Sequence, residues 1–466
     1  MAVGRDEPVE EDMWVATQNL PKSPGHVFYE RLNVLLREAG FDKFCEDLCA
    51  PYYAEKLGRP SIPPGVYFRM LLVGYFEGIE SQRGIAWRCS DSLALRAFLR
   101  IRLSRSTPDH STLTVIRKRL PVQVHEQVFM KVLEIAQARG LVKGQTVAVD
   151  ATTLEANAAM KSIVRKDSGE DWREYLTRLA KDAGIENPTD KDLRKFDKKR
   201  KGKKVSNDDW QSPSDPDARI MRMKNGDTHL AYKAEHAVDL ATEVVLAATI
   251  HPADRGDPET LPETLVQAQL NMMEAGNEQD IENVVADCGY HKAETLADCE
   301  SSGVRTYIPE QGRSGRRRWT DKPTGDREAY YRNRRRCRGR RSKRFQRWRS
   351  ERVERSFAHI CETGGARRSW IRGLMEVTKR YLIQVAAHNL GILMRKLFGM
   401  GTPRSLQGSS LLFFWLLHRW TCPFGPVLGI FRVVRRLLDP TDQFSRYIIH
   451  TDSTQQNLRL PALSAA

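Results

Sequence analysis

Two short apolar runs, each followed by an aspartate, constrain the fold of this chain more than any other feature. The run TVAV precedes Asp150, and the run NVVA precedes Asp287. Short runs rich in valine are typical of buried strands. An aspartate at a strand end often only caps a turn. Two of them in this setting predict a sheet with acids along one edge.

The order of the remaining patterns predicts the kind of sheet. Three strand-like runs come first, and helix-like and strand-like segments then alternate. This is the order of a ribonuclease-H-like mixed sheet, in which the first and fourth strands are neighbours, so we expect Asp150 and Asp287 to end adjacent strands. The expected strands lie at 145–156, 228–240, 243–252, 281–287 and 304–309. The expected helices lie at 257–275, at 292–303 and from residue 351 onward. In the first helix, Asp257 is expected to be the N-cap and Pro258 to lie in the first turn.

We therefore predict an α+β (mixed) protein with these domains. Residues 1–23 are a tail, residues 24–140 an all-helical domain, and residues 141–398 the ribonuclease-H-like domain. The latter carries a charged insertion at about 160–226 and a basic segment at 313–352, and residues 399–466 form a tail of unknown role.

The helical domain is predicted from the spacing of its apolar residues. Phe28, Leu32, Leu35 and Leu36 share one helical face, and a later helix begins after a double proline. The basic, Ser/Thr-rich loop RIRLSRSTPDHS suits a helix-turn-helix DNA reader. A plain helical bundle that only supports its neighbour is the alternative.

Charge points to a polyanionic partner. The net charge is +16, and residues 313–352 hold 18 Lys or Arg against 4 Asp or Glu, which is nearly the whole excess. Phe345 and Trp348 lie among these arginines, and aromatic rings can stack on unpaired bases. An unstructured basic linker is the alternative. The candidate DNA-binding residues are Arg334, Arg335, Arg336, Arg340, Arg341 and Arg347.

Other features bear on the compartment. The eight cysteines show no zinc spacing, and the acidic N-terminus lacks an apolar run, so we expect a reduced, cytoplasmic, nucleoid-associated protein. The apolar stretch at 411–434 is interrupted by His418, Arg419, prolines and glycines, so we do not expect a membrane span there.

Six separated blocks carry a family resemblance over about residues 13 to 400. They resemble bacterial insertion-sequence transposases of the group numbered 1182, within the insertion-sequence four and five lineage. The blocks are SPGHVFYERLN, RPSIPPGVYFRMLLVGYFEGIESQRGIAWR, VAVDATTLEANA, DARIMRMKNGDTHLAYKAEHAVD, VVADCGYHK and ERSFAHICETGGARRSWIRGL.

The resemblance implies an Asp, Asp, Glu catalytic triad at Asp150, Asp287 and Glu354, and a DNA-binding role for the helical domain. The wider lineage often has a Tyr, Arg, Glu, Lys signature around the glutamate. Here Arg347, Ser350 and Cys361 occupy the other three places, so Glu351 and Glu362 stay open as alternatives. Nearby Arg349, Arg352 and Arg355 could supply the missing phosphate contacts or could be solvated.

The expected function is that of a transposase that binds the ends of its element. It would cleave DNA there and transfer the strands, using two Mg²⁺ ions, with Mn²⁺ as a substitute. The partners would be DNA, as terminal inverted repeats and target, and further copies of the chain in a homodimer or higher assembly. The alternatives are a ribonuclease-H-like nuclease without joining activity and a non-enzymatic DNA-binding derivative of a transposase.

Overall fold

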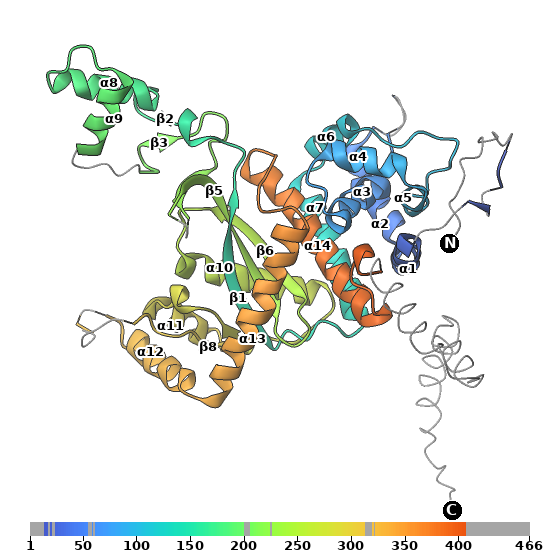
Figure 1. Ribbon diagram of the computed structural model, residues 1–466. Coiled ribbons are helices and arrows are strands. Elements are labelled where there is room, and N and C mark those ends of the chain that lie inside the picture. Colours follow the sequence, from blue (N-terminus) through green and yellow to red (C-terminus); the bar gives the residue numbers. More distant parts are fainter. Residues whose placement is uncertain are drawn as a thin grey trace, which may run out of the picture. The chain divides into compact units, whose positions relative to one another are not determined.

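The computed structural model describes residues 14–16, 19–20, 24–54, 58, 61–199, 206–223, 226–312, 319–320 and 322–406 (Figure 1). Most of the two predicted tails, and the apolar stretch at 411–434, lie outside the described residues. Within the described ranges, no helix is long and apolar enough to cross a membrane.

The N-terminal region is helical, as predicted. Helix α1 buries the four residues that were expected to share a face, and α3 starts at the second proline of the pair, Pro64, with Pro63 as its N-cap. Ser81, Ser92 and Asp109 cap α4, α5 and α6, because each side chain accepts a hydrogen bond from a backbone N–H of the first turn. The elements are α1 Pro24–Glu38, α2 Phe41–Cys49, η2 Ala50–Tyr52, α3 Pro64–Glu77, α4 Gln82–Asp91, α5 Leu93–Phe98, α6 His110–Arg119 and α7 Val122–Ala138.

A mixed sheet follows, with the expected neighbours. Strand β5 pairs antiparallel with β1 and with β6, whereas β7 and β8 continue the sheet from β1 in parallel. This arrangement confirms the ribonuclease-H-like fold. The strands are β1 Thr146–Glu155, β4 Arg219–Arg222, β5 Thr228–Asp239, β6 Val245–Pro252, β7 Asn283–Val285 and β8 Arg305–Tyr307.

Helices cover both faces of this sheet. Successive side chains of a strand point to opposite faces. In β5, Glu235 accepts hydrogen bonds from two threonines of α10. His236 instead bonds to Ser356 of α13 (Arg340–Phe357) and to Tyr381 of α14. Helix α10 therefore lies on one face, and α13 and α14 lie on the other. The remaining elements are α10 Asp257–Glu274, η4 Cys288–Tyr290, α11 Ala293–Ser301, α14 Leu374–Phe398 and η6 Pro403–Leu406.

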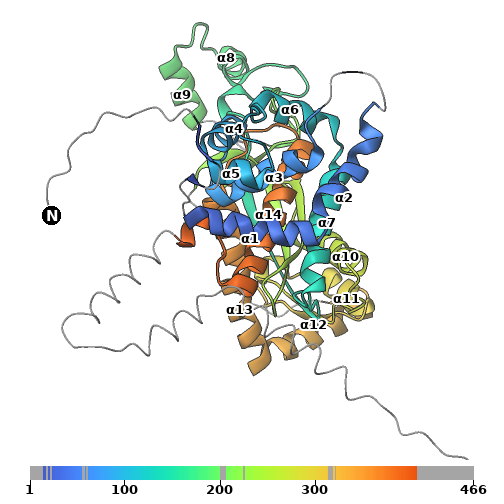
Figure 2. The same ribbon diagram turned by 90° about the vertical axis from the view of Figure 1, so that its right-hand side faces the viewer.

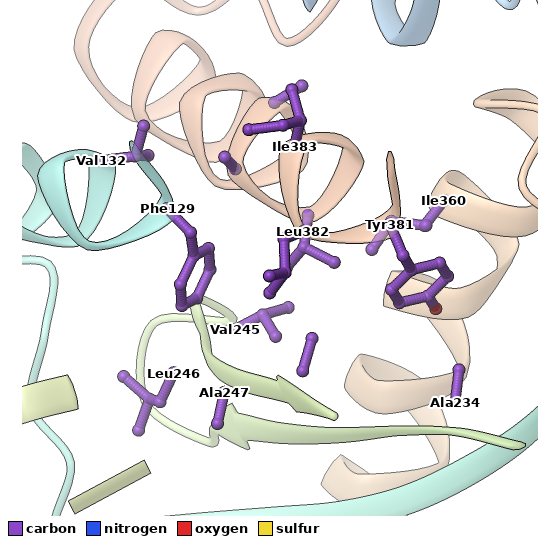
Figure 3. Close-up of a cluster of buried hydrophobic side chains, with 14 of the residues drawn as sticks. Phe129, Val132, Ala234, Val245, Leu246, Ala247, Ile360, Tyr381, Leu382 and Ile383 are labelled. Carbon is purple, nitrogen blue, oxygen red and sulfur yellow. The ribbon is translucent and has the colours of Figure 1, made fainter. Parts of the chain in front are cut away.

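The helical region and the sheet share one hydrophobic core. Helix α14, buried along most of its length, packs against α7 and α3 on one side and against β6 on the other (Figures 1 and 2). Phe129 of α7, Leu382 of α14 and Val245 of β6 meet in this core (Figure 3). The predicted boundary at residue 140 is thus a change of architecture within one compact unit.

The charged insertion is a small folded element. Helices α8 and α9 pack against each other around Leu176, Ala180 and Leu193, and Asp171 with Glu174 forms a capping box on α8. The expected end at about 226 is wrong, because β4 already pairs with β5 of the main sheet. The elements are η3 Met160–Ser162, β2 Val164–Arg165, α8 Trp172–Asp182, α9 Asp190–Lys199 and β3 Trp210–Gln211.

The described part of the basic segment is folded, in contrast to the alternative of an unstructured linker. Its described part forms two helices, α12 Thr324–Cys337 and α13 Arg340–Phe357, and α13 continues into the π-helical turn η5 Ala358–Thr363. The expected helix start at residue 351 is therefore wrong. Phe345 of α13 is buried like Val353 and Phe357, so the buried face extends further toward the N-terminus than the predicted helix.

The buried histidine of β5 predicts acid sensitivity. The neutral ring of His236 bonds to Ser356 and Tyr381, and burial lowers its pKa to about 3. In the unfolded state the pKa of a histidine is about 6.5, so the unfolded chain binds a proton at a higher pH than the folded protein does. The stability that His236 contributes is thus complete above pH 6.5 and is lost as pH falls toward 3.

Acidification from pH 7 to pH 5 should remove about 2 kcal/mol of the contribution that His236 makes to the free energy of unfolding. Urea unfolding at both pH values should show that His236→Asn loses less stability on acidification than the wild type does. An identical loss in both proteins would contradict the assignment.

Candidate active site

The pairing of β1 with β7 brings the two predicted aspartates together. The last residues of this parallel pair are Ala148 and Val285. Asp150 and Asp287 each lie two residues further on, so they occupy the same level along neighbouring strands. One part of the prediction is wrong: Asp150 does not end β1, because β5 remains paired with that strand as far as Glu155.

Each aspartate is held by a backbone group. Asp287 follows β7 and caps η4, where its Oδ1 accepts a hydrogen bond of 2.8 Å from the N–H of Gly289. Asp150 accepts one of the same length from the N–H of Ala151. Burial raises the pKa of Asp150 to about 6. The Arg349 guanidinium opposes this rise, and the charge of Asp287 adds to it. The two carboxylates therefore interact electrostatically.

Arg349 of α13 forms an ion pair with the Asp150 carboxylate. Its Nε also donates to Gln346 Oε1 over 3.2 Å. Gln346 Nε2 in turn donates to the carbonyl oxygens of Ala286, at 3.0 Å, and Tyr307, at 2.7 Å. A chain of polar contacts on α13 thus connects Asp150 with the ends of β7 and β8.

A third aspartate at this edge was missed as a site residue. Asp257 was expected to be an N-cap, but Gly256 is the N-cap of α10 and Asp257 is the first helical residue. A Cβ placed on Gly289 would lie 2.8 Å from Asp257 Oδ2 and 3.0 Å from Asp287 Oδ1, so these two carboxylates border the same small space. Nothing in the local sequence signals this contact, because it joins segments that are distant in the chain.

A buried polar network supports the Asp287 turn from the α10 side. The Tyr290 hydroxyl, in the same turn, donates to Glu235 Oε1 of β5 over 2.7 Å. Thr260 and Thr264 of α10 also donate to the Glu235 carboxylate. Lys233 Nζ lies 2.6 Å from Asp257 Oδ1 and 3.6 Å from Glu235 Oε1. The network joins η4, β5 and the start of α10 behind the aspartates.

The three candidate glutamates have different surroundings. Glu351 is exposed and pairs with Arg355 of the same helix at 2.7 Å. Glu362 lies in η5 and pairs with Arg367 at 2.7 Å. Glu354 is exposed on α13 and forms no ion pair with any described residue. In the described part of the chain, no three His, Cys, Asp or Glu side chains are grouped so that they could hold a metal ion.

The donor chemistry nevertheless fits a divalent cation. Hard cations such as Mg²⁺ bind carboxylate oxygens, and Asp150 and Asp287 present them at one edge of the sheet. Asp257 adds a further carboxylate nearby.

Of the six predicted DNA-binding arginines, one is mostly buried and five are exposed. Arg336 is only 20% exposed and donates to the carbonyl and hydroxyl of Thr306, so it has an internal role. Arg334 pairs with Glu310 at 3.1 Å but stays 44% exposed. The others are exposed on α12 and α13; they are Arg335, Arg340, Arg341 and Arg347.

Comparison with known proteins gives the family. Residues 17–119 match the family model described as Transposase domain (DUF772), and residues 143–390 match the one described as Transposase DDE domain. No curated protein matches the chain. The second match spans the sheet, the insertion, α13 and most of α14, which is more than half of the 466 residues. The chain therefore belongs to the DDE transposases, enzymes that cleave and transfer DNA strands.

Proposed function

We propose that this transposase acts on the ends of an insertion sequence of the group numbered 1182. It cleaves the DNA there and joins the freed 3′-hydroxyls to target DNA as a homodimer or higher assembly, in the cytoplasm and at the nucleoid. The observation that carries the proposal is the equal level of Asp150 and Asp287 on β1 and β7. A site that cleaves DNA with divalent metal ions needs carboxylates that lie side by side, as these two do.

In this proposal Asp150, Asp287 and Glu354 hold two Mg²⁺ ions, for which Mn²⁺ can substitute. Divalent ions supply activation of the attacking hydroxyl or water and stabilise charge on the leaving oxygen. The protein holds the carboxylates in place. The Tyr290 contact to Glu235 fixes the turn that bears Asp287, and pairing with β5 fixes Asp150 within its strand.

Two observations support Glu354 as the third acid. Glu351 and Glu362 are already paired with arginines, whereas Glu354 forms no ion pair with any described residue. At about 100° per residue, Glu354 lies one position from the buried Val353, whereas Glu351 lies two positions from it. Glu354 is therefore nearer to the face of α13 that meets the sheet.

The helical region supplies a candidate surface for reading the element ends. Trp87 of α4 and Val115 of α6 are exposed large apolar side chains. The basic loop between α5 and α6 is held in shape by Arg96 of α5, which donates to the carbonyl oxygens of Arg102, Leu103 and Arg105. An ordered loop beside two exposed helices suits contact with duplex DNA.

Removing the charge of either aspartate should abolish cleavage and leave DNA binding intact. Loss of an outer-shell partner of a metal ligand already costs about 10- to 100-fold in activity. Asp150→Asn and Asp287→Asn should therefore lower the cleavage rate of end-containing DNA by at least about 100-fold. Gel shifts should show unchanged binding. The matched control is Asp298→Asn, on the exposed face of α11. Wild-type cleavage by Asp150→Asn would refute the assignment.

The third acid can be identified by three single substitutions. Glu354→Gln should lose cleavage with both Mg²⁺ and Mn²⁺, because a ligand is removed from the site. Glu351→Gln and Glu362→Gln should retain cleavage, because they lose only surface ion pairs, each contributing less than about 1 kcal/mol. An active Glu354→Gln together with an inactive Glu351→Gln would move the assignment one turn back along α13.

The exposed arginines of α13 should determine the salt dependence of DNA binding. Each phosphate contact contributes about −0.9 to the slope of log affinity against log salt. Replacing Arg340, Arg341 and Arg347 together with Ala should flatten that slope by up to about three units. Arg173→Ala, at an exposed position of α8, is the control and should leave the slope unchanged. An unchanged slope in the triple variant would mean that α13 does not contact phosphates.

A further inference from the structure

The Asp150 carboxylate is already bonded to a cation of the protein itself. The Arg349 guanidinium and the Asp150 carboxylate are both largely buried, with 13% and 19% of the side chains exposed. Arginine stays protonated at any relevant pH, so its charge is permanent. A buried carboxylate is costly without such compensation.

Arg349 is also held in place from its other side. Its contact to Gln346 links it to the carbonyl oxygen of Ala286, the residue directly before Asp287. The guanidinium is therefore tied both to Asp150 on β1 and, through Gln346, to the residue before Asp287.

The other two arginines of this stretch are directed elsewhere. Arg355 pairs with Glu243 at 2.8 Å and with Glu351 at 2.7 Å. Arg352 donates to the carbonyl oxygen of Leu240, whose own N–H bonds to Thr146 at the start of β1. Of these three arginines, only Arg349 contacts a residue of the proposed site.

We propose that Arg349 acts as a latch: its guanidinium stays paired with the Asp150 carboxylate until a divalent metal ion displaces it. This inference rests on the proposed function, in which Asp150 is a metal ligand. Arg349 and the metal ion then compete for the same oxygens.

Competition makes a prediction that a purely structural ion pair does not. When a site is available only in a fraction of molecules, the apparent affinity falls by that fraction. Removing the latch should therefore tighten metal binding, although it removes a contact from the folded protein. Couplings of this kind are commonly at least about fivefold.

The test is Mn²⁺ binding to the full chain without DNA, measured from the electron paramagnetic resonance signal of free Mn²⁺. Arg349→Ala should lower the Kd for Mn²⁺ by about five- to tenfold. Arg349→Gln, which removes the charge but keeps a polar side chain, should do the same and serves if the alanine variant folds poorly. Arg355→Ala, on the same helix, is the matched control and should leave the Kd unchanged.

Thermal unfolding provides the second readout. Without metal, Arg349→Gln should unfold at a lower temperature than the wild type, because Asp150 is left unpaired. Mn²⁺ should then raise the unfolding temperature of the variant more than that of the wild type.

The outcomes separate the latch from the proposed function. If Asp150→Asn abolishes Mn²⁺ binding but both Arg349 variants bind with wild-type or weaker affinity, the latch is refuted and the metal site stands. If Asp150→Asn binds Mn²⁺ like the wild type, both the latch and the metal role of Asp150 are refuted.

Discussion

Hydrogen bonding between β1 and β7 fixes the relative positions of Asp150 and Asp287. The pairing of Ala148 with Val285 sets both aspartates side by side, each two residues beyond the last residues that pair β1 with β7. Side chains alternate between faces along a strand, so a slip of one residue would turn an aspartate to the other face. The register is secured by the apolar residues that precede the two aspartates, which are fully buried. The hydrophobic core thus determines where the acids lie.

Helices on the two faces hold the two aspartates with different kinds of contact. On the α10 side, Glu235 collects hydrogen bonds from α10 and from Tyr290, so the turn that bears Asp287 is tied to β5. On the α13 side, Gln346 and Arg349 reach the ends of β7 and β8 and the Asp150 carboxylate. The first set of contacts is neutral or charge-balanced. The second places a permanent cation on a carboxylate of the proposed metal site, and in our proposal α13 is therefore the part of the fold that responds to metal.

Local sequence patterns predicted the strands, and with them the neighbouring positions of Asp150 and Asp287, because burial of valine-rich runs is a local signal. They could not reveal Asp257 beside Asp287, or Arg349 on Asp150, because both contacts join residues that are distant in sequence. Asp257 also had a sufficient local explanation as a helix cap. The start of α13 was missed for a different reason: the high charge of residues 340–350 concealed the single buried aromatic, Phe345, that extends its apolar face.

The most direct measurement is anomalous diffraction from crystals of the full chain soaked in Mn²⁺. The account predicts a Mn²⁺ peak bonded to carboxylate oxygens of both Asp150 and Asp287, with the Arg349 guanidinium no longer on Asp150. A Mn²⁺ ion bound elsewhere, with the Arg349–Asp150 ion pair intact, would contradict both the assignment of the site and the part played by α13.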